Sequence, residues 1–182
     1  MTDLQPICAL GAPTPRTARF GGLSLAENSD LALASVALRR GGSAPALPLP
    51  GPGEWVEADG IAAFWTGPEQ WMVEGPGRAE TDFAAEIATR APGASVTEQT
   101  DGFVAFEAEG PAPAIVQLLE RLVNVDAGRF GAGSATRTGF HHMSIFVIRR
   151  AENRLAILGM RSAAGTIWHG LAEAAERLEV AA

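Results

Sequence analysis

The chain has 182 residues, of which 47% are hydrophobic and 19% are charged. This length suits one domain, or two small domains that share a core, and the composition excludes a disordered chain. The 21 acidic and 14 basic residues give a net charge of -7, which disfavours broad nucleic-acid binding because an acidic surface repels phosphate.

The cysteine content and the amino terminus bear on the cellular compartment. The single cysteine, Cys8, cannot form an internal disulfide, as is typical of a reducing compartment. The first ten residues lack the basic region and the apolar stretch of a signal peptide. The longest strongly apolar run, residues 144–148, is far shorter than the ~20 residues of a membrane helix. We therefore expect a soluble cytoplasmic protein that binds neither membranes nor nucleic acid.

The first 53 residues contain one predicted strand and one loop. Residues 31–37 alternate in a way that predicts a strand. Residues 41–53 are rich in proline and glycine, which indicates a surface loop, with a proline-rich ligand for another domain as the alternative. We divide the chain into residues 1–53 and an α+β domain of residues 54–182, with one intertwined unit as the alternative.

Two strands and a helix are predicted next. Residues 60–67 and 69–75 are short apolar runs separated by Gly67-Pro68, which is typical of two strands around a tight turn. Apolar residues at helical spacing then predict a helix within residues 79–91.

A second pair of strands and a second helix follow. Residues 94–100 and 103–110 predict strands, and Asp101-Gly102 between them is typical of a type I′ hairpin turn, which needs positive φ at both central positions. Residues 111–123 predict the clearest helix, because one face is apolar and proline stands at its start.

The last third of the chain predicts two strands and a long helix. Residues 141–150 and 154–160 are the strands, with a turn at Glu152-Asn153. The helix lies within residues 161–180, with Ser162 as its cap and an apolar stripe on one face.

These elements predict an α+β fold. From Glu69 to Arg150 their order is β-α-β-β-α-β, which is the ferredoxin-like order, with an antiparallel sheet and helices on one face. Additional strands precede this core, and a strand and a helix follow it.

The histidines do not predict a metal site or a catalytic base. His141 and His142 are adjacent on an expected strand, so their side chains would point to opposite faces and could not easily bind one metal ion. We expect one ring to pack inside and the other to face solvent or a partner. No metal-binding motif accompanies them or His169, and Cys8 lacks the context of a nucleophile. We therefore predict no catalytic and no metal-binding residue in this chain.

Arginine and tryptophan provide the remaining candidates. Five arginines form a basic concentration, which indicates solvated hairpin ends or else an anion site or partner surface: Arg137, Arg149, Arg150, Arg154 and Arg161. Four tryptophans, of which we expect roughly two in the core, are also candidate interface anchors: Trp55, Trp65, Trp71 and Trp168.

Several segments together resemble the gamma subunit of heterotetrameric sarcosine oxidase, in order and in spacing. The resemblance covers roughly residues 55–175 and is carried by "GPEQWMVEG", "TDGFVAFEAEGP", "LLERLVNVDAGRF", "TRTGFHHMSIFVIRR" and "LAILGMRSAAGTIWHGLAEA". None of these segments is a catalytic motif. The resemblance also implies a distant relation to the folate-binding fold of the glycine-cleavage T-protein.

The resemblance implies a function within a larger enzyme. Such a complex oxidatively demethylates sarcosine to glycine, forms hydrogen peroxide and transfers the one-carbon unit to tetrahydrofolate. Its alpha, beta and delta subunits would be the partners and would hold FAD, FMN, NAD, tetrahydrofolate and zinc, while this chain would hold no cofactor. The chain would then be a non-catalytic accessory subunit.

A second function stays open, in which the chain is a stand-alone folate-binding or T-protein-like protein of one-carbon metabolism. Folate carries carboxylates and a flat ring, so its pocket would combine arginine with an aromatic platform; the candidates are Arg137, Arg161, Trp71 and Trp168. For an interface with other subunits, the candidates are Trp65, Trp71, Arg137, His141 and Trp168.

Overall fold

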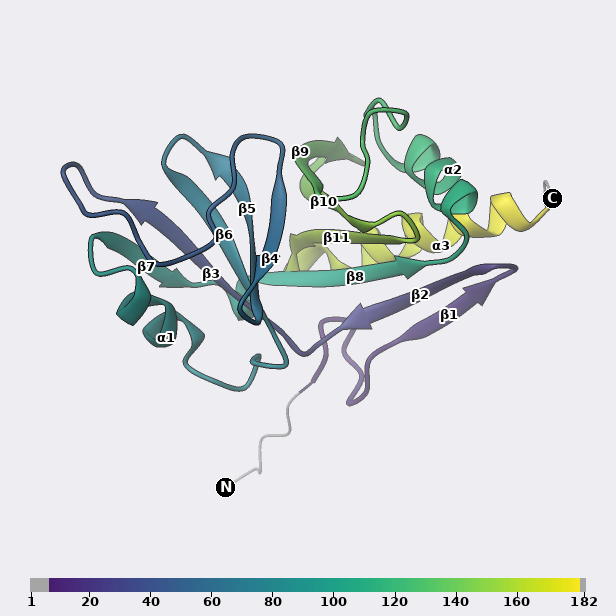
Figure 1. The fold of residues 1–182 in the computed structure, drawn as a ribbon. Coiled ribbons are helices and arrows are strands. Elements are labelled where there is room, and N and C mark those ends of the chain that lie inside the picture. Colours follow the sequence, from purple (N-terminus) through teal and green to yellow (C-terminus); the bar gives the residue numbers. More distant parts are fainter. Residues whose placement is uncertain (1–6, 181–182) are drawn as a thin grey trace, which may run out of the picture.

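The computed structural model describes residues 7–180 and has the predicted α+β class, with two antiparallel sheets and three α-helices (Figure 1). The helices are α1 (Phe83–Arg90), α2 (Ala112–Leu122) and α3 (Ala164–Val180). No helix among these residues is both long and apolar enough to cross a membrane.

The larger sheet has six strands in the order β1-β2-β8-β11-β10-β9. With α2 and α3 it forms what we call the six-stranded half. Its strands are β1 (Thr17–Phe20), β2 (Leu23–Asn28), β8 (Phe103–Glu109), β9 (Ser134–Phe140), β10 (Met143–Ala151) and β11 (Arg154–Met160).

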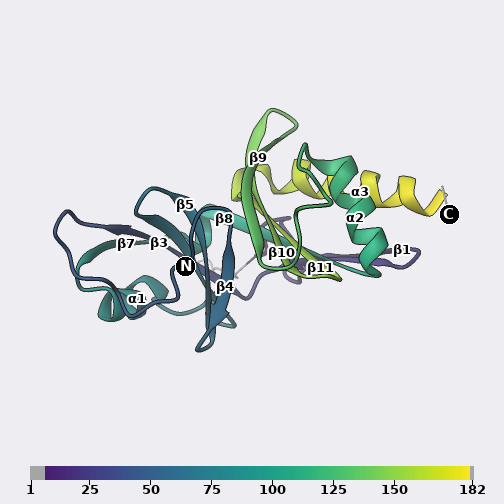
Figure 2. The same cartoon turned by 45° about the horizontal axis from the view of Figure 1, so that its top comes forward.

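The smaller sheet has five strands in the order β4-β5-β6-β3-β7. With α1 it forms the five-stranded half, and Figure 2 shows α1 at the opposite end of the molecule from α2 and α3. Its strands are β3 (Leu31–Leu38), β4 (Trp55–Ala58), β5 (Ile61–Gly67), β6 (Gln70–Pro76) and β7 (Ala94–Glu98).

The ferredoxin-like order is present, but the predicted span from Glu69 to Arg150 was wrong because its strands belong to two sheets. In the six-stranded half, β8 and β10 are parallel, are joined through α2, and have β11 between them, which is a split βαβ unit. Strand β2, from the start of the chain, pairs with the free side of β8 and supplies the fourth strand.

The five-stranded half repeats this plan. Strands β6 and β7 are parallel, are joined through α1, and have β3 between them, while β5 pairs with the free side of β6. Strands β2 and β3 therefore bring the described part of the first 53 residues into both sheets, so this part shares its cores with residues 54–182.

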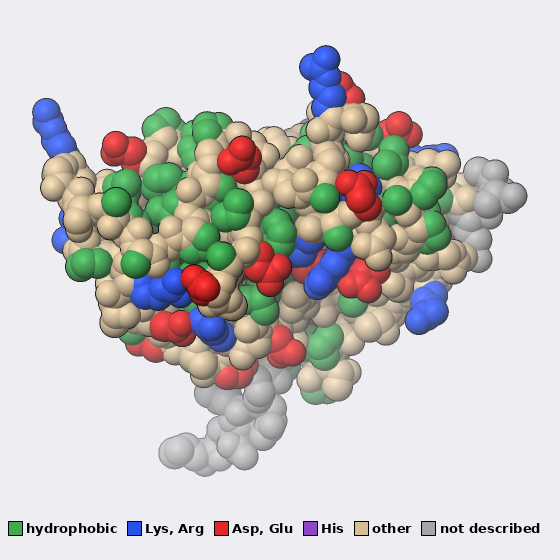
Figure 3. All heavy atoms as spheres, in the orientation of Figure 1, with side chains coloured by type: hydrophobic (Ala, Val, Ile, Leu, Met, Phe, Trp, Pro, Cys, Tyr) green, Lys and Arg blue, Asp and Glu red, His purple; other side chains and the backbone are tan. Residues whose placement is uncertain are grey.

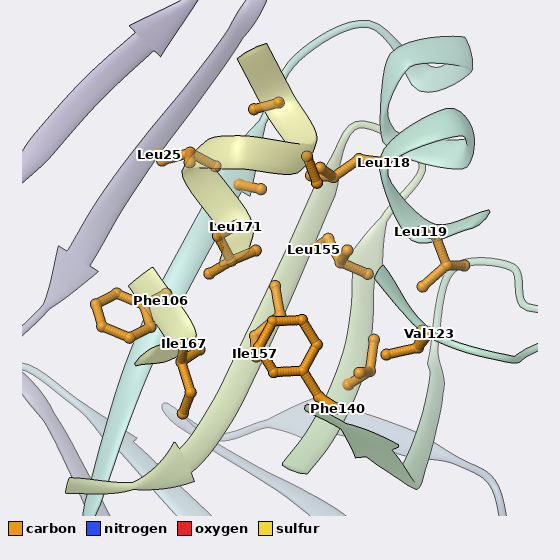
Figure 4. Packing of buried hydrophobic residues seen from close by; sticks show 14 of the residues in the cluster. Leu25, Phe106, Leu118, Leu119, Val123, Phe140, Leu155, Ile157, Ile167 and Leu171 are labelled. Carbon is orange, nitrogen blue, oxygen red and sulfur yellow. The ribbon is translucent and has the colours of Figure 1, made fainter. Parts of the chain in front are cut away.

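Three apolar layers hold these elements together. The first lies between the six-stranded sheet and helices α2 and α3, where Leu118 of α2 and Leu171 of α3 point toward sheet residues such as Leu155 and Ile157 (Figure 4). The second lies between the two sheets, and the third lies outside the five-stranded sheet under α1. Strands β8 and β10 are buried on both faces, as expected for a covered sheet.

Two connections differ from prediction. Asp101-Gly102 is not a hairpin turn: it lies in a short 3-10 turn, Thr100–Gly102, that carries the chain from β7 in one sheet to β8 in the other. Ser162 lies inside the 3-10 turn Arg161–Ala163 rather than at the boundary of α3. The predicted turn at Glu152-Asn153 is confirmed between β10 and β11.

The histidine pair was also placed wrongly. Strand β9, which the sequence did not predict, pairs with β10, and His141 and His142 form the two-residue turn between them. Both have positive φ, 43° and 67°, as a type I′ turn requires. Both are exposed, so neither ring is buried as we expected.

Candidate functional site

A cavity of about 620 Å³ opens at one end of the layer between the two sheets. We call it the inter-sheet cleft. Its size lies in the range of small-molecule sites. Its walls are mostly apolar, with one guanidinium group, and include Met72, Phe103, Arg137, Met143, Phe146 and Met160. Met160 is 54% exposed, although it is a large hydrophobic residue.

Strand register explains how Arg137 reaches this cleft. Arg137 on β9 is the direct partner of Phe146 on β10, and its guanidinium carbon lies 6.0 Å from the centre of the Phe146 ring. Its Nε donates a hydrogen bond of 2.7 Å to Oγ of Ser144. Phe103 lies beside Phe146, with ring centres 6.4 Å apart. The cleft therefore offers two aromatic rings and one partly tethered cation to a ligand or to a partner's side chain.

A buried network of charges occupies the other end of the same layer. Its central member is Arg150, whose Nη1 and Nη2 donate to Glu74 at 2.7 and 2.8 Å and whose Nε donates to Oε1 of Glu107 at 3.2 Å. The indole of Trp55 also donates to Glu74, at 2.7 Å. Because Glu74 is on β6 while Arg150 and Glu107 are on β10 and β8, this network connects the two sheets.

Successive side chains of a strand point to opposite faces, and this places the cleft and the network in the same layer between the two sheets. On β6, β8 and β10, a cleft residue is followed two or four positions later by a network residue, so both point between the sheets. These pairs are Met72 and Glu74, Phe103 and Glu107, and Phe146 and Arg150. Figure 3 shows acidic and basic side chains next to one another where the two halves meet.

Burial determines the electrostatics of the network. Loss of solvent raises the pKa of Glu107 above its usual value, although Arg150 and Arg154 act to lower it. Burial also opposes the charge of Arg150, but the carboxylate of Glu74, followed by that of Glu107, outweighs it and raises the pKa of Arg150. Arg150 is therefore a permanent cation between two carboxylates.

The four folate-pocket candidates do not line one cavity. Arg137 lines the inter-sheet cleft, whereas Arg161 lines another cavity of about 480 Å³ and donates to the carbonyl oxygen of Ile7 at 2.7 Å. Trp168 is 4% exposed and packs on Phe106 in the core of the six-stranded half. Neither of these two cavities is lined by Trp71 or Trp168, so neither places one of the two arginines beside one of the two tryptophans.

The hairpin tryptophans lie together, as expected from the turn between their strands. Trp65 and Trp71 are direct cross-strand partners on β5 and β6, and both are half-buried. The indole of Trp71 donates to the carbonyl oxygen of Pro50 at 2.7 Å, so the proline-rich segment covers part of this pair.

His141, the remaining interface candidate, is exposed on another side of the molecule. Its ring meets that of Phe140 edge-on, with centres 4.4 Å apart. His141 lines a cavity of about 520 Å³ between α2 and α3. Gly170 also lines this cavity, and a Cβ atom at position 170 would lie only 2.4 Å from the Phe140 ring.

The basic concentration does not form one surface. Arg149 is 1% exposed and donates to the turn at Ala151 and Glu152, and Arg150 is in the charge network. Only part of the set, including Arg137 and the half-exposed Arg154, reaches solvent. Both readings that we considered for the five arginines as a group, hairpin ends or an anion surface, fail for Arg149 and Arg150.

The two glutamates of the charge network, Glu74 and Glu107, were not among the predicted site residues. Each interrupts an apolar strand, as "QWMVEG" and "FVAFEAEG" show, and each is on the face of its strand that points between the sheets. A charge at an inward position is a usable signal, because such residues are rarely buried unless paired. Within residues 7–180, no group of three or more histidine, cysteine or acidic side chains could hold a metal ion.

Comparisons with known proteins give likeness of fold only. No family model matches the sequence, and no curated protein matches it. A chain of the heterotetrameric sarcosine oxidase from Corynebacterium sp. U-96 is similar, with a TM-score of 0.70 and 19% identity over 89% of this chain and 88% of that one. The glycine cleavage system aminomethyltransferase T from Bartonella henselae is similar with a TM-score of 0.56 and 16% identity over 80% of this chain.

The two matches differ in length. This chain spans 44% of the T-protein chain, but nearly the whole of the sarcosine oxidase chain. The resemblance seen in the sequence is thus confirmed for the fold: the chain has a T-protein-like α+β fold in the form that a chain of a heterotetrameric sarcosine oxidase also has.

Proposed function

We propose that the chain is a non-catalytic accessory subunit of a heterotetrameric sarcosine oxidase. The observation that carries this proposal is the fold match over almost the full length of both chains, with a protein whose solved structure is such an assembly. The sequence segments that resemble the gamma subunit support it independently. The partners would be the alpha, beta and delta subunits, which would hold the flavins, NAD, tetrahydrofolate and zinc.

The surface offers anchors for such partners. Trp65 and Trp71 are half-buried neighbours, and Met160 is exposed at the rim of the inter-sheet cleft. Tryptophan is enriched among residues that dominate interface energies, and methionine adapts to varied partner surfaces.

The proposal is tested by the yield of hydrogen peroxide from sarcosine. We expect none from the isolated chain, and more from alpha, beta and delta chains co-expressed with this chain than from the same three without it. Oxidation of sarcosine by the isolated chain, or equal yield without it, would contradict the proposal.

Two variants locate the interface. At least one of Trp65→Ala and Trp71→Ala should keep a near-normal melting temperature but fail to co-purify with the other subunits, because truncating such an anchor costs about 2 kcal/mol or more of binding. If both variants unfold, the two tryptophans are core residues, and the docking surface is to be sought near Arg137 and His141.

The stand-alone folate-binding function is the second candidate, and the inter-sheet cleft is the observation that favours it. The cleft combines Arg137 with the rings of Phe103 and Phe146, in place of the tryptophans that we expected. Calorimetric titration of the isolated chain with tetrahydrofolate tests this function. Binding that Arg137→Gln weakens and Arg161→Gln leaves unchanged would support it, and no binding would exclude it.

A further inference from the structure

A smaller cavity of about 270 Å³ lies at the outer end of the charge network, and we call it the acidic pocket. It is formed on β2 and β8, which pair directly, and on the adjoining β11. The side chains that matter for its chemistry are Asn28, Asp30, Glu107, Glu109 and Arg154. Neither the proposed subunit role nor the folate alternative uses this pocket.

One carboxylate oxygen in the acidic pocket has no hydrogen-bond donor. Glu107 is 7% exposed, and its Oε1 accepts from Arg150 at 3.2 Å and from the side chain of Asn28 at 3.4 Å. Its Oε2 is buried and has no hydrogen-bond partner among the described residues. Nε of Arg154 forms an ion pair with Oε2 at 3.6 Å, which is beyond hydrogen-bonding distance. A buried acceptor in this state is costly unless something donates to it.

The charges around this oxygen favour a cation. Four carboxylates line the pocket, those of Glu27, Asp30, Glu107 and Glu109, against the single guanidinium of Arg154. Glu27 is already engaged, because its two oxygens accept from the backbone N–H groups of Leu10 and Arg16. Arg154 is shared, since its Nε also pairs with Glu109 at 3.1 Å. Arg150 also pairs with Glu107 but is shared with Glu74, so the carboxylates around the pocket still outnumber the guanidinium groups.

The type of cation follows from the ligands available. The described acidic side chains do not converge in the groups of three or more that would hold a metal ion. A single buried oxygen instead matches one N–H donor, and a charge-assisted bond of this kind is stronger than a neutral one. The volume of about 270 Å³ leaves room for a molecule of several non-hydrogen atoms.

We propose that the acidic pocket binds a small primary or secondary organic ammonium ion, which donates an N–H group to Oε2 of Glu107. The ligand takes the side of Glu107 that Arg154 now faces from 3.6 Å, so Arg154 competes with it. The two side chains therefore have opposite roles: Glu107 binds the ammonium group and Arg154 opposes it.

Protein-observed NMR titration of the full chain tests this proposal, with methylammonium as the probe and tetramethylammonium, which has no N–H group, as its control at the same ionic strength. We expect saturable shifts for amides of β2 and β8 with methylammonium alone. Glu107→Gln should weaken binding about tenfold or more, because it removes a charge-assisted hydrogen bond. Arg154→Gln should strengthen it, and Glu57→Gln, an exposed carboxylate on β4, should leave it unchanged.

Three results would overturn the proposal. The first is equal shifts with both ammonium ions, or no saturable shift with either. The second is unchanged binding in Glu107→Gln, which is expected to fold because it removes a buried charge without changing the shape of the side chain. The third is weaker binding in Arg154→Gln.

Discussion

The two halves of the molecule share a split βαβ plan but cover the outer faces of their sheets differently. The six-stranded sheet is covered by α2 and by α3, which follows β11 in the chain. The five-stranded sheet is covered by α1, and the position that corresponds to α3, after β3, is occupied by the proline-rich residues 39–53. Leu47 and Leu49 of that segment pack on the same apolar cluster as α1.

The side chains differ accordingly. The outer layer of the six-stranded half contains large residues such as Phe106, Trp168 and Leu171. That of the five-stranded half contains many alanines, and its buried members include Ala32, Ala34, Ala63, Ala91 and Ala94. A loop can therefore replace a helix where the side chains on the sheet surface are small. Trp65 and Trp71 of the same sheet are half-buried, and Pro50 of the loop accepts a hydrogen bond from Trp71.

The largest expected effect tests whether the halves fold independently. Ile145→Asp places a charge at a site that is 2% exposed in the six-stranded half, and we expect it to prevent folding because the charge has no partner there. The five-stranded half should unfold as well, since the layer between the sheets is shared. Circular dichroism and NMR measure both effects. A folded five-stranded half in this variant would show that the two halves are separate units.

The charge network that joins the halves gives the next largest effect. Arg150→Met leaves Glu74 and Glu107 buried without their shared cation and should lower the free energy of unfolding by about 3–5 kcal/mol. Arg154→Gln is the matched control: its side chain is 45% exposed, so its loss should cost below about 1 kcal/mol. Urea unfolding measures both, and similar costs for the two variants would refute a buried connection between the halves.

The same substitution on the two covering segments compares them directly. Leu171→Ala in α3 removes a side chain that is 1% exposed and should cost about 2–5 kcal/mol. Leu47→Ala in the proline-rich segment removes a half-buried side chain and should cost about 1 kcal/mol, because less apolar surface is lost. The melting temperatures of the two variants measure these two losses of stability. Equal losses would mean that the loop covers its sheet as firmly as the helix does.

The smallest expected effect is a difference in pH dependence between Glu107 of β8 and Glu98 of β7. Burial raises the pKa of Glu107, so its contribution to stability is fully present below the ordinary pKa of about 4.3 and is lost as pH rises through the raised value. Burial also acts to raise the pKa of Glu98, but hydrogen bonds from the Thr100 hydroxyl and from nearby backbone N–H groups, including that of Ala84, lower it. Its contribution is therefore present above about pH 4.3 and is lost as pH falls through the lowered value.

Replacement of each glutamate by glutamine checks these signs. Glu107→Gln should reduce the loss of stability on raising the pH, and Glu98→Gln should reduce the loss on lowering it. The free energy of urea unfolding as a function of pH measures both. Changes of the same sign in the two variants would contradict the assignment.

Local pattern predicted most elements but not how they pair. The apolar stripe of α2, the alternation of β3 and the apolar run of β10 gave their positions, because burial on one or two faces determines residue type. Pairing between β2 and β8, or between β3 and β7, joins residues more than 50 positions apart, and no local signal encodes it. Asp101-Gly102 was misread for this reason: turn chemistry is local, but the sheet to which the next strand belongs is not.

The candidate site was predicted only in part. Arg137 does line the inter-sheet cleft, but its aromatic neighbours are phenylalanines that the sequence marked only as strand residues. Strand β9 was missed because polar and small residues dominate it, and the histidine turn was therefore assigned to a strand. Glu74 and Glu107 carried a signal in their inward positions, but their shared partner, Arg150, depends on which sheets face each other.

The mass of the assembly formed with partner chains tests the central claim most directly. The chain is co-expressed with the alpha, beta and delta chains of a sarcosine oxidase and analysed by size-exclusion chromatography with light scattering. We predict that this chain of 18.9 kDa elutes within a much larger complex, in equal number with the other subunits. Elution of the chain alone at its own mass, beside partners that assemble without it, would contradict its role as a subunit.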